Sequence, residues 1–199
     1  MLHGKWGWLP KEGPRERELE EALDMTDHYP KSLLIFVLVA GFSTSAYPCT
    51  IARRISSREM VSGADAIVRA IAVEYSVPPS QPDVWTSGVP DSKIRFHVVE
   101  NISGSALADF SIPGYLVDKD DFNDQPSPYE FVRPGGRGGS CFANSYRSKA
   151  QFLLLLKKTK EGELTVNWCA LAPVNEQLRS DDDPWLLWVR ERVKERTQR

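Results

Sequence analysis

The sequence has little histidine, little cysteine and no excess of either charge. Only three of its 199 residues are histidine and three are cysteine, and it contains neither the His-Glu-x-x-His nor the Gly-x-Ser-x-Gly pattern, so the side chains of zinc hydrolysis and of triad chemistry are missing. Residues 47–199 carry 20 Lys+Arg and 20 Asp+Glu, a balance that does not favour a polyanionic partner. We therefore expect no enzyme, no metal, no cofactor and no nucleic-acid partner.

The chain also lacks an apolar run that could span a bilayer, which takes about 20 residues. Its longest apolar run, Leu33–Phe42, follows Lys31 and ends in small residues up to Ala46, which is the pattern of a secretory signal. We expect residues 31–46 to be a signal peptide and the protein to be secreted, extracellular or periplasmic, without a stable membrane anchor. A cytoplasmic tail ahead of a signal anchor is the alternative.

Residues 1–30 stand where a secretory signal would normally begin. Met25 lies shortly before Lys31, at the usual length of the basic segment of a signal. We interpret residues 1–30 as a misassigned or disordered N-terminal extension. The remaining chain is long enough for one domain, residues 47–178, followed by a C-terminal helix over residues 179–199.

Five segments are rich in β-branched and apolar residues and are bounded by turn signals. They are Ala66–Tyr75, Lys93–Glu100, Ala108–Val117 (bent at Pro113), Ala150–Lys158 and Leu164–Trp168. In the second strand the alternation turns Ile94, Phe96 and Val98 to the core and His97 outward. The sequence therefore predicts a mostly β fold, best described as a five-stranded Greek-key β-barrel of the OB type, with a β-sandwich as the alternative.

Two helices flank these strands. Ser56 and Glu59 have the spacing of a capping box, which predicts a short helix over Ser57–Gly63. Asp183 is a good N-cap before Pro184, so a second helix follows to the C-terminus. Trp185 and Trp188 lie on one face of this helix and form either a lid over the core or an exposed patch.

The order of the cysteines and strand patterns resembles a known family. The features are Cys49 before a short helix, the Gly63–Ala70 strand opening, the segment Arg95–Gly104, Ser140–Phe142 before an apolar strand, and Leu164–Cys169 before a short tail. This order resembles the netrin-like domain, the OB-type barrel shared with tissue inhibitors of metalloproteinases, in its short bacterial secreted form. The resemblance spans roughly Cys49–Leu178.

The resemblance implies disulfides that tie the N-terminal segment to the barrel. Because three cysteines cannot all pair within one chain, the options are Cys49–Cys141, which we favour, Cys49–Cys169 and Cys141–Cys169. All three could also be buried free thiols. The inhibitors of this family chelate a protease zinc through a cysteine at the mature N-terminus. Here Tyr47 and Pro48 precede Cys49 after the expected cleavage.

We therefore expect a secreted, non-catalytic netrin-like module that binds a protein or cell-envelope partner. The alternative is a metalloprotease inhibitor of the tissue-inhibitor type, which would present the ridge Cys49, Thr50 and Ile51 to a protease. An enzyme of unknown type is the third hypothesis. Carboxylates between Asp118 and Asp124 have a spacing that could hold calcium, but a solvated acidic loop is the simpler interpretation.

Overall fold

The fold is described from a computed structural model, in which residues 54–81, 89–138 and 141–198 are placed. All of them belong to one compact unit spanning Tyr47–Arg199. The predicted signal peptide, the N-terminal extension and the ridge Cys49–Ile51 lie outside the described residues. No helix within the described ranges is long and apolar enough to cross a membrane.

The chain enters the described region through the short helix α3 (Ser57–Gly63), as predicted. The Ser56 hydroxyl accepts a hydrogen bond from the backbone N–H of Glu59 at 3.2 Å, which caps the helix N-terminus. Strand β1 (Ala66–Val77) follows and is the centre of the main sheet, because it pairs with β2 (Lys93–Ser103) on one side and β6 (Gln151–Lys158) on the other, both antiparallel. Ile94 and Phe96 are buried and His97 is exposed, as the alternation predicted.

The sheet has more strands than the five expected. In the described residues it has six, in the order β3 (Asp109–Pro113), β2, β1, β6, β7 (Leu164–Val166), with β8 (Asn175–Gln177) also paired to β6. The expected strand Ala108–Val117 breaks at Gly114, because the side chain of Tyr146 packs against that glycine and a Cβ there would lie only 2.5 Å from its ring. Its second half, β4 (Tyr115–Val117), pairs in parallel with β5 (Ser145–Arg147) as a separate two-stranded sheet.

The main sheet is strongly curved. The register between β1 and β2 shifts at four places along the strand, and such bulges bend and twist a sheet. As a result the edge strands β3 and β7 approach each other, although the described strands include no ladder between them. A cavity of about 620 Å³ lies between these edges, with Phe110 and Leu164 in its lining.

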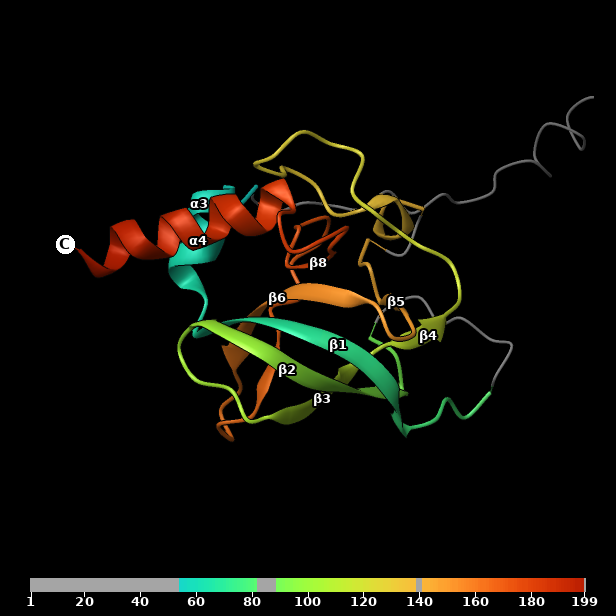
Figure 1. The fold of residues 1–199 in the computed structure, drawn as a ribbon. Coiled ribbons are helices and arrows are strands. Elements are labelled where there is room, and N and C mark those ends of the chain that lie inside the picture. The colour runs from blue at the N-terminus through green and yellow to red at the C-terminus, as the bar shows by residue number, and fades with distance from the viewer. Residues whose placement is uncertain (1–53, 82–88, 139–140, 199) are drawn as a thin grey trace, which may run out of the picture. The chain divides into compact units, whose positions relative to one another are not determined.

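The main sheet is covered on both faces, because Phe152–Leu156 of β6 are all buried and successive side chains of a strand point to opposite faces. The largest buried rings of the core include Phe96, Tyr146 and Phe152, which pack edge-to-face at centroid distances of 5.1 to 6.0 Å. Helix α4 (Pro184–Thr197) begins after Asp183, as predicted, and buries Trp185, Leu186 and Val189. Figure 1 shows α4 beside α3 at one end of the sheet, away from β3.

The segment between β4 and β5 is long and mostly irregular. It contains one turn of 3-10 helix, η2 (Pro134–Gly136). Phe122 of this segment forms a parallel bridge with Gln177 of β8. The segment therefore packs against β8 of the main sheet. Its buried contacts are described below with the candidate site.

Candidate functional site

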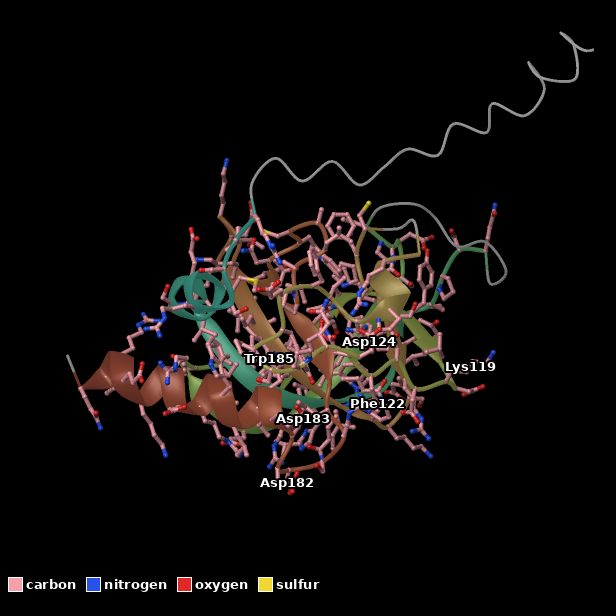
Figure 2. The ribbon with its side chains drawn as sticks, turned by 90° about the horizontal axis from the view of Figure 1, so that it is seen from above. Lys119, Phe122, Asp124, Asp182, Asp183 and Trp185 are labelled. Atoms are coloured by element: carbon pink, nitrogen blue, oxygen red, sulfur yellow. The ribbon has the colours of Figure 1, made fainter. Side chains whose placement is uncertain are left out.

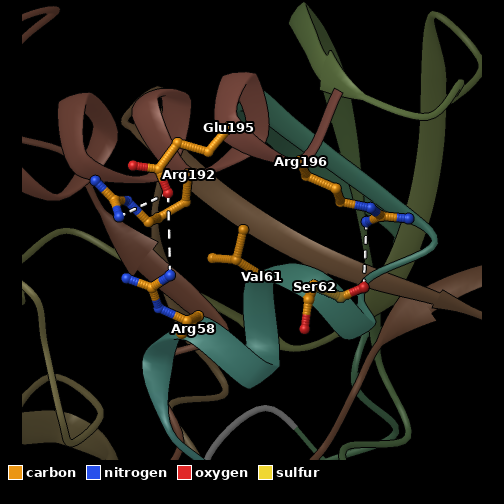
Figure 3. Close-up of a pocket in the computed structure, with 6 residues that line it drawn as sticks. All are labelled: Arg58, Val61, Ser62, Arg192, Glu195 and Arg196. Carbon is orange, nitrogen blue, oxygen red and sulfur yellow. Dashed lines mark hydrogen bonds and ion pairs between the residues drawn. The ribbon is translucent and has the colours of Figure 1, made fainter. Parts of the chain in front are cut away.

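Helices α3 and α4 lie side by side and enclose a cavity of about 350 Å³ between them. The lining side chains come in equal numbers from the two helices, with Arg58, Val61 and Ser62 on α3 and Arg192, Glu195 and Arg196 on α4 (Figure 3). Residues four apart share a face of a helix, which is why Arg58 and Ser62, and likewise Arg192 and Arg196, line the same cavity. The lining of this cavity is therefore set by the residues on the facing sides of α3 and α4.

A second cavity of about 540 Å³ continues the first toward the entry of the chain. Arg58 lines both cavities, so they are neighbours, and we call the two together the α3–α4 groove. The second part is bordered by the residues before α3, by the segment between β4 and β5, and by α4. Its lining consists of Arg54, Ile55, Ser56, Ser57, Arg58, Pro128, Glu130 and Trp188.

The α3–α4 groove is predominantly basic. Glu195 lies between two arginines, with its Oε2 at 2.7 Å from Nη1 of Arg192 and at 4.0 Å from Nη1 of Arg58. At the far end Arg196 donates a hydrogen bond of 3.1 Å to the carbonyl oxygen of Ser62, and at the near end Arg54 pairs with Glu130. Four arginines against two glutamates leave the lining with a net positive charge.

The apolar part of the groove rests on a stack of aromatic rings. Trp188 stacks on the buried Trp185 at a centroid distance of 5.1 Å, and Trp185 stacks on Tyr129 at 5.2 Å. Burial, with smaller contributions from the charges of Asp183 and Glu176, raises the pKa of Tyr129 to about 12, so this ring stays neutral. The guanidinium of Arg192 lies 5.7 Å from the centre of the Trp188 ring. Trp185 therefore acts as a lid on the core, whereas Trp188 joins the core to the groove.

A buried arginine anchors the segment between β4 and β5. The side chain of Arg133 is completely buried, and its Nε donates to Asp121 at 2.9 Å. Its other nitrogens donate to the carbonyl oxygens of Ala143, Ser145 and Asn175. The guanidinium thus has four partners, which satisfies most of the donors of a buried arginine, and two of them, Ser145 and Asn175, tie this segment to β5 and β8.

Glu176 of β8 completes this buried polar cluster. Its Oε1 accepts from the backbone N–H of Arg133 at 3.2 Å and its Oε2 from Nδ2 of Asn123 at 2.9 Å. Burial raises the pKa of Glu176 to about 7, against the lowering effect of Arg133, whose charge is also paired with Asp121. The same segment contacts the start of α4 and the residues before it, because Arg179 lies 4.6 Å from the ring centre of Phe122 and Ser127 donates to the carbonyl of Pro184 (Phe122 is labelled in Figure 2).

The cysteines that the sequence singled out are only partly described. Cys169 is half-buried and carries a free thiol whose pKa is raised by burial. The carbonyl of Cys141 accepts a hydrogen bond of 2.8 Å from Leu171, so the segments of these two cysteines are neighbours. Cys49, Thr50 and Ile51 lie outside the described residues, and the Cys49–Cys141 pairing stays a prediction.

The other candidates have ordinary structural partners. His97 is exposed, with Nδ1 at 3.1 Å from Asp109. The carboxylates weighed as calcium ligands contact arginines, since Asp120 pairs with Arg147 and Asp124 with Arg137. Within the described residues no three His, Cys, Asp or Glu side chains gather where they could hold a metal ion.

Neither a protein-family model nor a curated protein matches this sequence. This groove was not predicted from the sequence. The four-residue spacing of Arg192 and Arg196, repeated by Arg58 and Ser62, is the signal that could have indicated a shared face. That the two faces would meet depends on the packing of α3 against α4, which no local pattern encodes.

Proposed function

We propose that this protein is a secreted, non-catalytic module of the netrin-like type that binds a protein or cell-envelope partner through the α3–α4 groove. The observation that supports this best is the combination, in one concave surface, of four arginines with the exposed side of a packed tryptophan. Arginine and tryptophan are the residues most enriched at the energetic centres of protein interfaces. Arg192, Arg196 and Trp188 are held in place here by contacts within the protein, so these side chains would lose little freedom on binding.

The finer fold assignment, an OB-type Greek-key barrel, belongs to the same proposal. It is supported by the bulges in β1 and by the approach of β3 to β7, because a curved sheet whose edges meet is the geometry of a small barrel. A short helix before the first strand and a helix after the last one agree with the expected architecture. A structure solved by crystallography or NMR would test closure through hydrogen bonds between β3 and β7.

The binding proposal is tested by site-specific photo-crosslinking in the cells that make the protein. A benzophenone amino acid replaces Ser62 in the groove, and in a matched variant it replaces Val99, an exposed residue on β2 that lies outside the groove. We expect one defined crosslinked protein or envelope component from position 62 and none from position 99, with the product lost when unlabelled protein is added in excess. Equal products from both positions, or none from position 62, would overturn the proposal.

A further inference from the structure

We infer that the ligand of the α3–α4 groove is a short, extended, acidic peptide segment of a partner protein. Its carboxylates would lie against Arg58 and Arg196, and an apolar side chain would lie beside Trp188. The inference rests on the proposed function, since it takes the groove to be the binding surface and names the chemistry that the groove recognises.

The first argument is the surplus of hydrogen-bond donors at the helical end of the groove. Each guanidinium carries five N–H donors, and Glu195 is the carboxylate that Arg58 and Arg192 share. The side chain of Arg58 is 66% exposed and its distance of 4.0 Å to Glu195 is too long for a hydrogen bond. Arg192 already pairs with two glutamates, and Arg196 makes one hydrogen bond in the described structure. Carboxylates arriving in the groove would satisfy the open donors of Arg58 and Arg196.

The second argument concerns the type of anion. The planar fork of arginine binds carboxylate and phosphate groups through two parallel hydrogen bonds. A membrane surface or a nucleic acid presents dense, uniform negative charge, which Glu195 and Glu130 within the groove would oppose. Acidic side chains spaced along a peptide can be placed against the arginines and away from the glutamates. The mixed charge of the lining therefore favours a peptide.

The third argument concerns the length of the groove and the apolar residues at one of its ends. Trp188 and Arg196 are eight residues apart on α4, which is about 12 Å along a helix axis. That length corresponds to about four residues of extended chain. Ile55 and Pro128 lie with Trp188 in the lining at the other end from Arg196, and they provide apolar surface for one side chain. The groove thus fits a segment of about four residues with a hydrophobic residue at one end.

The probe for the test is a fluorescein-labelled peptide of four residues, phenylalanine, glutamate, serine and glutamate, in which the two carboxylates are spaced along the chain. Binding to the purified mature chain is followed by fluorescence anisotropy at two salt concentrations. We expect saturable binding in the micromolar to submillimolar range, weakened at the higher salt concentration because the arginines are partly exposed. A peptide with glutamine in place of glutamate should bind at least about tenfold more weakly, as expected when several charge-assisted hydrogen bonds are lost.

Two double variants locate the site. Arg58→Gln with Arg196→Gln should weaken binding of the probe about tenfold or more. Arg95→Gln with Arg147→Gln removes the same charge from exposed arginines outside the groove and should leave the affinity within about twofold of the wild type. Thermal melting of each variant shows that it is folded. Equal loss in both double variants would mean attraction to overall charge, which overturns the inference.

The inference can fail while the proposed function stands. Vesicles of phosphatidylglycerol provide the competing class of anion in the same assay. If these vesicles bind through Arg58 and Arg196 and the acidic peptide does not, the ligand class inferred here is wrong, yet crosslinking from position 62 would still identify an envelope partner. If neither probe binds and position 62 yields no crosslink, both proposals are overturned.

Discussion

Glu176 accepts a hydrogen bond from the backbone N–H of Arg133 at 3.2 Å, and both side chains are completely buried. The Arg133 guanidinium is also paired with Asp121, so the cluster carries a net negative charge whenever Glu176 is ionised. Asn123 is the second donor to Glu176, and the buried Tyr146 lies on the core side of Arg133. A buried cluster of this kind couples the stability of the fold to pH.

We predict that the free energy of unfolding decreases between about pH 4.5 and pH 7. The pKa of Glu176 is raised to about 7 in the folded protein from 4.5, so the folded state retains a proton that the unfolded chain releases in this range. The loss is on the order of 3 kcal/mol. Urea unfolding at pH 5 and pH 8 measures it.

The matched variant for this pH dependence is Glu176→Gln, which keeps the shape of the side chain without its ionisation. Its unfolding free energy should vary less between pH 5 and pH 8 than that of the wild type. If the two profiles have the same slope, Glu176 is not the group responsible.

Replacing Arg133 should be among the most damaging single substitutions. Arg133→Met leaves the buried Glu176 and the half-buried Asp121 without their cation and removes a donor from three carbonyl oxygens. Breaking a buried pair from one side costs about 3–5 kcal/mol, measurable by urea unfolding. Arg147→Met removes an exposed arginine that pairs with the exposed Asp120, and should cost no more than about 1 kcal/mol. Similar losses in the two variants would contradict the anchoring role of Arg133.

The N-terminus of α4 provides a comparison between neighbouring aspartates (Figure 2). Asp183 accepts from the backbone N–H groups of Trp185 at 2.9 Å and of Arg179 at 3.0 Å. Asp183→Ala should therefore lower stability by about 1–2 kcal/mol. Asp182 bonds only to the hydroxyl of Ser180 in the described contacts, so Asp182→Ala should leave the melting temperature nearly unchanged. If Asp182→Ala lowers the melting temperature more than Asp183→Ala does, Asp183 is not the N-cap of α4.

Substitution of the two tryptophans of α4 should have different effects, one mainly on the stability of the fold and the other mainly on peptide binding. Trp185 is completely buried, so Trp185→Ala should destabilise the fold by about 3–5 kcal/mol. Trp188 is partly exposed and lines the groove. Trp188→Ala should cost less stability and weaken binding of the acidic peptide, as measured by melting and by anisotropy. Unchanged peptide affinity in Trp188→Ala would remove this ring from the proposed site.

Mass spectrometry of the exported protein, with and without reduction, tests the predictions for the N-terminal segment. We expect a mature chain that begins near Tyr47, a linked peptide containing Cys49 and Cys141, and an alkylatable Cys169, in agreement with its free thiol. A linked peptide containing Cys169 would refute this pairing. A mature chain that begins at Cys49 would instead favour inhibition of a metalloprotease through Cys49, Thr50 and Ile51.

The parts of the fold that the sequence predicted are those with local causes. The capping residues Ser56 and Asp183 define both helices, and the apolar alternation of Lys93–Glu100 and the run Phe152–Leu156 define two of the longest strands. Strand β8 could not be predicted in this way. Its residues Asn175, Glu176 and Gln177 are all polar and all buried, because their side-chain partners lie 29 to 57 residues earlier in the chain.

The candidate site was less predictable for a related reason. Cys49–Ile51 was chosen from a family resemblance, whereas the groove depends on how α3 and α4 pack, and these helices are separated by the whole sheet in sequence. The arginines were visible in the sequence, but their convergence is a property of tertiary structure. What the sequence showed of this region was the helical face that carries Trp185 and Trp188.

The approach of β3 to β7 also bears on how the protein behaves at high concentration. Free sheet edges are templates on which other molecules can add strands and start aggregates. Here the curvature of β1 turns the two edges of the main sheet toward each other, and β7 is only three residues long. Each edge therefore limits the access of foreign strands to the other, which reduces self-association in a chain whose formal net charge is only −2.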